Sequence, residues 1–406
     1  MRDYINVCLF GIFLRWCVSL YPYSGAGKPP MFGDYEAQRH WQEITVNLPL
    51  KEWYINSTDN DLEYWGLDYP PLTAYHSLLC GLVARYINPN FTTLHVSRGF
   101  ESKDHKLFMR YTVLVIDLLI FIPAAFLLFR NNENICKSKS GLFSCFSALM
   151  LYPGLFIIDY GHFQYNNASL GLFIIAVGLL YKNLDYASGI FFVLALNYKQ
   201  MELYHSLPFF AYFLGKFYKE NTFFQCLKKL SIMGFVVLFT FLVCWFPFLN
   251  NFELIFQIIR RIFPIARGLF EDKVASFWCS LSIIFKLKLM FSNSTMALIC
   301  LLTTLSLSLP SSVHLFCYPK PNVFKYSLIN ISFIFFLFSF HVHEKSILLV
   351  AIPASLVYCE EPLIVCWFFI ISIIKYDNAF IQKFTEKGQE NQEFSTPYNH
   401  LASYFI

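Results

Sequence analysis

The chain has 406 residues, of which 56% are hydrophobic and 14% are charged, and its formal net charge is +4. An average soluble domain contains roughly 25% charged residues, so this composition excludes a disordered chain, a coiled coil and an ordinary soluble enzyme. The apolar residues also occur in runs too long for buried core helices. The sequence therefore predicts an all-α polytopic membrane protein. Its positive charges are spread along the chain and do not indicate nucleic-acid binding.

Apolar stretches along the chain predict about 11 transmembrane helices, although several are shorter than the usual ~20 residues. The candidate spans cover residues 4–21, 108–129, 142–158, 168–181, 186–198, 203–217, 230–249, 296–310, 326–340, 345–359 and 362–375. The first stretch contains Arg15 and lacks a clean cleavage site, so we expect a retained helix and not a cleaved signal peptide. The stretch 278–290 is short and contains Lys286 and Lys288. We expect it to form a surface helix that does not cross the membrane.

Basic residues in the short loops predict the orientation of the chain. Lysines and arginines in loops 130–141 and 216–229 place these loops in the cytosol and the long segment 22–107 on the lumenal side. The glycosylation sequons at Asn56 and Asn90 fit a lumenal position for this segment. Within it, the amphipathic stretch 72–88 is typical of a helix that lies in the plane of the membrane surface.

Twelve cysteines are scattered along the chain, mostly in apolar stretches. They include no C-x-x-C pair and no Cys/His spacing typical of zinc ligands. We interpret them as small buried side chains, with a Cys80–Cys279 disulfide as the one conceivable bridge.

The informative polar clusters all fall on the predicted lumenal side, in residues 22–107, 159–167, 197–205, 250–277 and 341–346. A transporter would instead place ionisable residues within its spans, where Asp117 is the main acid. Clusters at the membrane boundary suit a lipid-linked substrate. Sugar transfer from a lipid phosphate needs a carboxylate as base and positive charge near the leaving phosphate. The segments GDYEAQRHW (33–41) and HVHEK (341–345) supply both kinds of group.

Purely structural alternatives exist for these residues. Asp34 could cap a helix after a glycine, with Glu36 and Arg39 on a solvated helix face. Lys199 and Glu202 could form a local ion pair at a helix end.

The other two motifs also have structural alternatives. Pro70 and Pro71 break helices and favour an extended Tyr69. The HVHEK segment could cap two helices, or His341 and His343 could bind a metal, although no third ligand is nearby in the sequence.

Eight segments of the chain together resemble one protein family. They are GDYEAQRHWQEIT (33–45), YWGLDYPPLTAYHSLL (64–79), SRGFES (97–102), HKLFMRYTVL (105–114), IDYGHFQYN (158–166), NYKQMELYHSLPFF (197–210), RGLFEDKVASFWCS (267–280) and FSFHVHEKSILL (338–349). In this order, along roughly residues 20–375, they closely resemble the ALG6/ALG8 glucosyltransferase family of the endoplasmic reticulum. The first segment resembles the enzymes that add the first glucose, not the second.

This resemblance implies a GT-C type glycosyltransferase fold in the endoplasmic reticulum membrane, with a lumenal active site and interfacial helices in a large first lumenal loop. The implied donor is dolichyl phosphate glucose. The implied acceptor is dolichyl-diphosphate Man9GlcNAc2, which receives glucose in α-1,3 linkage during N-glycan precursor assembly. A β-linked donor and an α-linked product mean inversion in a single displacement. No cofactor and no metal are expected, because cationic side chains can stabilise the leaving phosphate.

The resemblance also implies roles for individual residues. Asp34 corresponds to the family's general base, with Asp68 and Glu344 as further catalytic candidates. Aromatic side chains of Trp41, Trp65 and Tyr69 would stack on sugars or anchor the loop at the interface. The candidate substrate-binding residues are Glu36, Arg39, His162, Gln164, Lys199, Arg267, His341, His343 and Lys345.

Residues 1–375 are expected to form one transmembrane glucosyltransferase domain, with segment 22–107 as its first lumenal loop. The polar tail 376–406 departs from the family, whose members continue with further hydrophobic segments, and we expect a truncated or alternative C-terminus. Three alternative functions therefore stay open: the sibling enzyme that adds the second glucose, a polytopic lipid or sugar transporter, and an inactive truncated relative.

Overall fold

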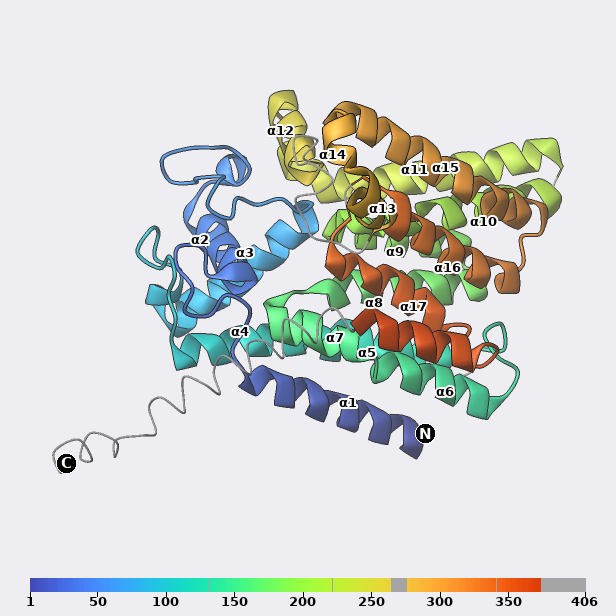
Figure 1. Cartoon of the computed structure of the whole chain (residues 1–406), viewed down its shortest axis with the longest axis horizontal. Coiled ribbons are helices and arrows are strands. Elements are labelled where there is room, and N and C mark those ends of the chain that lie inside the picture. The colour runs from blue at the N-terminus through green and yellow to red at the C-terminus, as the bar shows by residue number, and fades with distance from the viewer. Residues whose placement is uncertain (131, 221, 264–275, 341, 374–406) are drawn as a thin grey trace, which may run out of the picture.

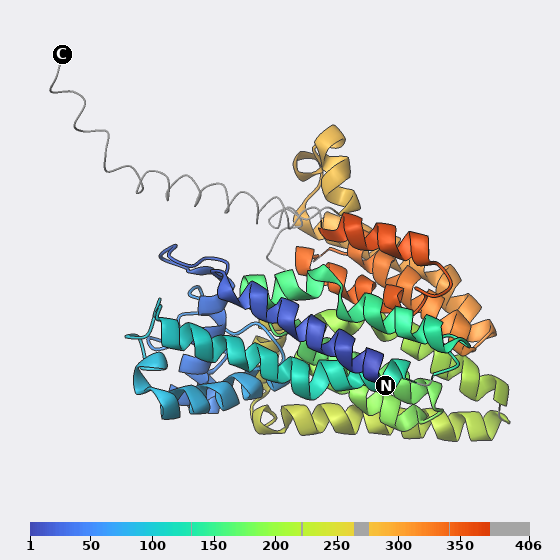
Figure 2. The same ribbon diagram turned by 90° about the horizontal axis from the view of Figure 1, so that it is seen from below.

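A computed structural model describes residues 1–130, 132–220, 222–263, 276–340 and 342–373. Within these ranges every regular element is a helix, as the sequence predicts (Figures 1 and 2). The polar tail 376–406 and the site candidates Arg267 and His341 lie outside the described residues.

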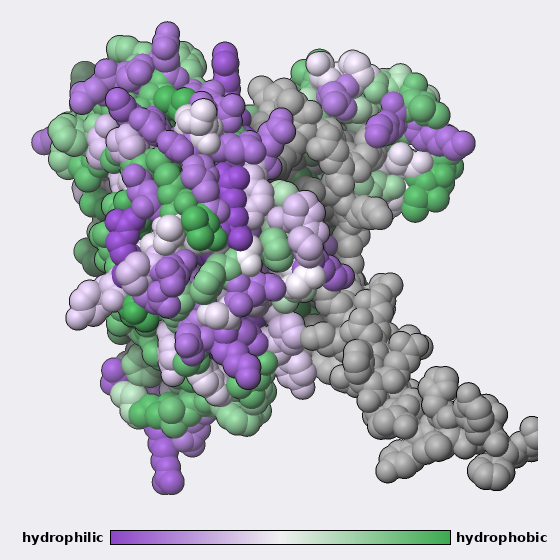
Figure 3. All heavy atoms as spheres, turned by 90° about the vertical axis from the view of Figure 1, so that its left-hand side faces the viewer, coloured by the Kyte–Doolittle hydropathy of each residue, from purple (hydrophilic) through white to green (hydrophobic). Residues whose placement is uncertain are grey.

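The segment between the first helix and the main bundle, residues 21–102, lies at one end of the bundle and is called the first loop (Figure 1). Its elements, after α1 (Arg2–Leu20), are α2 (Gly33–Asn47), η1 (Leu50–Glu52), α3 (Pro71–Ile87) and η2 (Pro89–Phe91). Pro71 occupies the first turn of α3, where its missing N–H needs no partner. Polar and charged side chains gather on the face of the molecule that the first loop covers (Figure 3).

The first half of the main bundle consists of helices that run back and forth, with the first loop at one end of the bundle (Figure 2). They are α4 (Lys103–Ile116), η3 (Asp117–Phe121), α5 (Ile122–Phe129), α6 (Lys139–Met150), α7 (Pro153–Phe156), η4 (Ile157–Phe163), α8 (Asn166–Tyr181), α9 (Asp185–Tyr198), η5 (Gln200–His205), α10 (Ser206–Glu220) and α11 (Phe223–Trp245). Two of these elements, η3 and η4, are π-helical insertions in longer helices. Such insertions are frequent at functional sites.

The second half returns the chain to the first loop. Its elements are η6 (Phe246–Phe248), α12 (Phe252–Ile262), α13 (Phe277–Phe285), α14 (Leu287–Met290), α15 (Asn293–Cys317), α16 (Pro321–Phe338), η7 (Glu344–Ile347), α17 (Leu348–Ser355) and a last helix Pro362–Ile373. Residues of α12 pack into one apolar cluster with Trp41, Trp53 and Tyr54 of the first loop.

Each of the predicted spans overlaps a helix of the structure, but within the described residues only six helical runs are long and apolar enough to cross a membrane by length and composition. These are Arg2–Leu20, Lys103–Phe129, Lys139–Phe163, Phe223–Phe248, Asn293–Cys317 and Pro321–Phe338. The structure thus supports a multi-pass membrane protein, and the count of about 11 spans stays a prediction.

The interrupted stretch 278–290 is not a spanning helix. It forms α13 and α14, separated by Lys286 in the left-handed region at φ 43°. The nine residues of α13 reach only about 14 Å at 1.5 Å per residue. This length agrees with the predicted non-crossing segment.

The cysteines are all free thiols in the structure. Cys80 is buried in α3 and Cys279 lies in α13, and no bridge joins them. The conceivable disulfide was therefore wrong. The interpretation of buried side chains holds for five cysteines, whereas six are half-buried and Cys366 is exposed.

A buried ion pair fixes α1 against the bundle. The Nε atom of Arg15 donates a hydrogen bond to Oδ2 of Asp117 at 2.6 Å, and both side chains are fully buried. The same carboxylate accepts hydrogen bonds from the Tyr160 hydroxyl (3.0 Å) and the Asn167 amide (2.5 Å). The charged residue in the first predicted span is thus neutralised inside the protein and is not exposed to lipid.

Replacing only one partner of this ion pair should destabilise the fold. Asp117→Leu leaves the Arg15 charge buried without its partner, and loss of one member of such a pair costs about 3–5 kcal/mol. We expect a much lower unfolding midpoint in detergent than for Arg2→Ala, which changes an exposed arginine of the same helix. The double variant Arg15→Met with Asp117→Leu should recover part of the loss. A single variant as stable as Arg2→Ala would contradict this role.

Candidate active site

The start of α2 places Asp34 at the border between the first loop and the bundle. Phe32 and Gly33 both adopt left-handed conformations, with φ 52° and 70°. A Cβ atom on Gly33 would lie 2.4 Å from the Ser24 carbonyl oxygen, so this tight turn requires glycine. Phe32 is the N-cap and Asp34 lies inside the first helical turn. The alternative in which Asp34 caps the helix is therefore wrong.

The Asp34 carboxylate forms an ion pair with Lys345, whose Nζ atom donates to Oδ2. The two side chains are 22% and 10% exposed, respectively, so the pair remains accessible from the site. Burial by itself would raise the pKa of Asp34, but the charge and hydrogen bond of Lys345 outweigh it and hold the pKa below its ordinary value. In this state Asp34 is ionised and paired with the ammonium group of Lys345.

Two histidines and a second lysine surround this pair. Both histidines lie close enough to Asp34 to interact with it electrostatically, and burial lowers the pKa of His343 to about 3, so its ring is neutral. The Nδ1 atom of His343 accepts a hydrogen bond from the backbone N–H of Lys345 at 3.3 Å, which fixes the start of η7. Lys199, at the end of α9, interacts electrostatically with both Asp34 and Lys345. The predicted residues His162, Lys199, His343 and Lys345 thus come together at Asp34.

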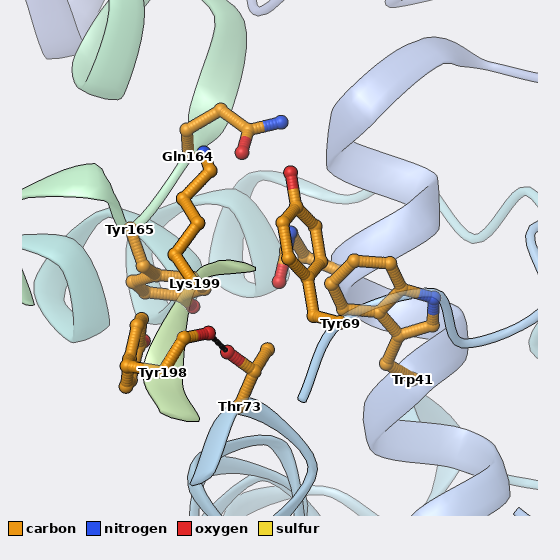
Figure 4. A pocket seen from close by; sticks show the side chains of 8 residues that line it. Trp41, Tyr69, Thr73, Gln164, Tyr165, Tyr198 and Lys199 are labelled. Carbon is orange, nitrogen blue, oxygen red and sulfur yellow. Dashed lines mark hydrogen bonds between the residues drawn. The ribbon is translucent and has the colours of Figure 1, made fainter. Parts of the chain in front are cut away.

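A small pocket opens beside Lys199 (Figure 4). Tyr69 lies between Trp41 and Lys199, with its ring centroid 5.2 Å from the Trp41 ring and 5.1 Å from the Lys199 amine. The cavity measures about 10 Å³, which is room for about one water molecule. Its walls combine aromatic rings with amide, hydroxyl and amine groups: Gln38, Trp41, Tyr69, Thr73, Gln164, Tyr165, Tyr198 and Lys199.

A chain of buried hydrogen bonds connects Lys199 to the interior of the bundle. The Lys199 amine donates to the side-chain oxygen of Asn166, and the Asn166 amide donates to Asp159 at 2.6 Å. Asp159 also accepts from the backbone N–H of Asn167 at 2.9 Å, and the Asn167 side chain donates to Asp117. The position of the site lysine is therefore fixed by the same network that holds α1.

Sequence reasoning missed Asp159, Asn166 and Asn167 as site-supporting residues, although it marked the polar segment 159–167. The available signal was an acid followed by two adjacent asparagines at the start of an apolar run. The segment was also expected to be a loop, whereas residues 157–163 are π-helical and α8 begins at Asn166.

Glu36 and Arg39 lie within a buried cluster of the first loop. The Arg39 guanidinium contacts Glu36 at 2.6 Å and Glu43 at 2.7 Å, and donates to the Ser97 hydroxyl. The Tyr64 hydroxyl donates to Glu36 at 2.9 Å. A solvated helix face was therefore the wrong alternative. Substrate contact by Glu36 and Arg39 stays a prediction, and their burial indicates that they stabilise the first loop.

The residues around η5 differ from the predicted local ion pair. Glu202 is fully buried and contacts Nδ1 of His205 at 2.8 Å, whereas Lys199 bonds Asn166. The Lys199–Glu202 pair at a helix end was therefore wrong. Gln200 donates to the backbone carbonyl of Asp68 at 3.3 Å, which holds the segment that carries Tyr69 beside the pocket.

Two further predicted aromatic and acidic residues lie at the margin of the site. Glu344 is partly exposed in η7, next to Lys345. The Trp65 indole donates to the backbone carbonyl of Met31 at 2.6 Å, and Trp65 does not line the pocket of Figure 4. Trp65 therefore anchors the turn that precedes α2.

A carboxylate held beside two lysines, at the margin of an aromatic and polar pocket in a multi-pass helical protein, suits a membrane-embedded transferase that binds an anionic substrate. The profile of the ALG6, ALG8 glycosyltransferase family matches residues 11–379. The chain belongs to this family.

Curated relatives of known name support this membership. A rat protein named dolichyl pyrophosphate Man9GlcNAc2 alpha-1,3-glucosyltransferase is 53% identical over 367 residues, which cover 90% of this chain and 72% of the relative. Proteins named as probable enzymes of the same kind are 52% identical in Drosophila melanogaster, over 90% of this chain and 76% of the relative, and 44% identical in Arabidopsis thaliana, over 89% and 67%.

Removing the side chain that holds Lys199 should weaken glycosyl transfer. Asn166→Ala removes a hydrogen bond to a charged group, worth about 1.5–3 kcal/mol, and we expect kcat/KM to fall roughly tenfold or more. The KM for the sugar donor should rise and the KM for the acceptor should not. Asn183→Ala is the matched control, because Asn183 holds a different lysine, Lys216, at 2.9 Å. Equal effects of both variants would reject a specific role for Asn166.

Proposed function

We propose that the chain transfers the first glucose from dolichyl phosphate glucose to dolichyl-diphosphate Man9GlcNAc2, in α-1,3 linkage and with inversion. The observation that supports this most directly is the Asp34–Lys345 pair beside Lys199. It combines a base for the acceptor hydroxyl with cations for the leaving phosphate. The names of the relatives supply the acceptor, and the donor is inferred from the family resemblance.

The reaction needs one displacement. Asp34 accepts the proton of the attacking acceptor hydroxyl, whose oxygen forms a bond to the anomeric carbon of glucose. The bond from that carbon to the phosphate oxygen breaks on the opposite face, and the electron pair leaves with dolichyl phosphate. Lys199 faces the developing negative charge, and charge stabilisation of this kind is commonly a large contribution to catalysis.

Lys345 interacts with the base before the step and with the donor phosphate during it. While it contacts Asp34, it keeps the carboxylate a weak base. A bound phosphate competes for the same ammonium group, so donor binding draws Lys345 away and raises the pKa of Asp34. The base thereby gains strength when the donor is in place.

The aromatic pocket is the proposed sugar site. Its present volume of about 10 Å³ is too small for a hexose, so Tyr69 or Gln164 must move when the sugar enters. Trp41 and Tyr69 then offer ring faces for stacking.

The proposed setting is the endoplasmic reticulum membrane, with the first loop and Asp34 on the lumenal side. Exposed sequon asparagines Asn56 and Asn90 on the first loop agree with this side. The transfer is proposed to need no metal. The described residues contain no cluster of three His, Cys, Asp or Glu side chains suited to a metal, and the lysines supply positive charge to the phosphate.

Changing the proposed base should nearly abolish transfer without unfolding the protein. Asp34→Asn keeps the size of the side chain but cannot accept the acceptor proton, and general-base catalysis contributes about 10²- to 10⁴-fold. Purified protein with synthetic donor and acceptor should show a loss of kcat in this range. Asp104→Asn, an exposed acid in the first turn of α4, should retain full activity. Retained transfer by Asp34→Asn would refute the base assignment.

The pH profile of kcat/KM should report the two charged groups of the free enzyme. The lowered pKa of Asp34 places the acid limb below the ordinary carboxyl range, because activity is lost only when the carboxylate is protonated. Burial lowers the pKa of Lys199 to about 8, so activity should fall as the pH rises through that value and the ammonium loses its proton. Lys345 lowers both pKa values.

Lys345→Met should therefore shift both limbs of the residual kcat/KM profile to higher pH, whereas Lys345→Arg should leave them nearly in place. A profile of Lys345→Met with unchanged limbs would show that Lys345 does not control the charges of Asp34 and Lys199.

Complementation in cells distinguishes addition of the first glucose from addition of the second. The cells used lack their own enzyme for the first addition. Complementation by this chain should remove the accumulated lipid-linked oligosaccharide that carries no glucose. Rescue only of cells that accumulate the form with one glucose would assign the second reaction instead.

A further inference from the structure

Residues at the ends of α5 and α8 line a second and larger cavity. These helix ends lie at the opposite end of the bundle from the first loop (Figure 1). Its volume is about 560 Å³, within the range of typical ligand sites. Apolar side chains of Leu127, Leu128, Ile174 and Ile175 line its walls. The transfer reaction proposed above makes no use of this cavity.

The rim of the cavity is positively charged. Arg130 and Lys182 line it together with a single carboxylate, Glu133. The Arg130 guanidinium lies over the Phe126 ring at 5.5 Å. Within the part of the chain that the structure describes, neither cation forms an ion pair. The rim therefore presents one net positive charge.

A hydrogen bond keeps this rim beside the apolar walls. The Asn134 side chain donates to the backbone carbonyl of Tyr181 at 3.0 Å and so ties the turn after α5 to the end of α8. At this level both helices change from apolar residues to a charged loop, as expected at a membrane–water boundary. The cavity thus joins a hydrocarbon-like wall to a cationic rim at the depth of lipid headgroups.

We propose that this cavity binds one glycerophospholipid with an acidic headgroup. An acyl chain lies along the apolar wall of α5 and α8, and the headgroup phosphate contacts Arg130 and Lys182. Basic pockets between membrane helices bind anionic lipid headgroups in this manner. The net positive rim favours an acidic headgroup over a zwitterionic one. This site is independent of the glycosyl-transfer site, from which the length of the bundle separates it (Figure 1).

Native mass spectrometry of the full chain, with added phosphatidylserine or phosphatidylcholine, tests the charge requirement. Wild type should retain phosphatidylserine about tenfold better than phosphatidylcholine, and Arg130→Gln with Lys182→Gln should remove this preference. Lys137→Gln with Lys139→Gln is the matched control, because these lysines belong to the same charged region but do not line the cavity. No preference in wild type, or an unchanged preference in the rim variant, would overturn the proposal.

Gly178→Leu tests the apolar wall separately. A Cβ atom at Gly178 would meet only the Leu128 side chain, at 3.6 Å, so a larger side chain extends into the cavity without backbone clash. This variant should keep its unfolding midpoint and glycosyl transfer but retain about tenfold less phosphatidylserine. Glycerophosphoserine, which lacks acyl chains, should not bind wild type. Full lipid retention by Gly178→Leu, or tight binding of the free headgroup, would show that the acyl chain does not occupy this cavity.

Discussion

The contact between Asp34 and Lys345 is the constraint around which the rest of the site is arranged. It joins residues 311 positions apart, one at the start of α2 and the other in η7. The first loop, π-helical η4 and the end of α9 must all pack correctly before His162 and Lys199 can reach the same point. The site therefore exists only in the assembled bundle, and none of its charges functions as a local motif.

The interior of the bundle carries an unusual load of polar groups for a chain with 14% charged residues. Buried polar groups are costly unless their hydrogen bonds are satisfied. Here the cost of burial is offset by a continuous series of hydrogen bonds. The series links Arg15, Asp117, Asp159 and Asn166 to Lys199. The π-helical insertions that hold Asp117 and Asp159 shift these acids within their helices. The buried network that stabilises the bundle therefore also orients Lys199 in the site.

Much of this arrangement was predictable, and the failures share one physical cause. Hydrophobic length located the helices, and the motifs that contain Asp34 and Lys345 marked the site. Sequence spacing could not reveal the burial of Glu36 and Arg39, because charges three positions apart on a helix look the same on a solvated face and in a protein interior. It also missed Asp159 and Asn166, whose importance depends on contacts that only tertiary packing creates. The partner of Lys199 was misassigned for the same reason.

In the proposed mechanism, the sharing of Lys345 between Asp34 and the donor phosphate sets the order in which the two substrates bind. Because Lys345 neutralises Asp34 before substrate binds, an acceptor that arrives first meets a weak base. A donor that arrives first supplies phosphate to Lys345 and leaves the carboxylate free to accept a proton. Donor binding and activation of the base are then one event, and the reactive state forms only with the phosphate in place. A site whose carboxylate had no cationic partner would not require the donor to bind before the base becomes active. In this mechanism, one lysine shared between base and leaving group accounts for both the low pKa of Asp34 and its proposed use as a base.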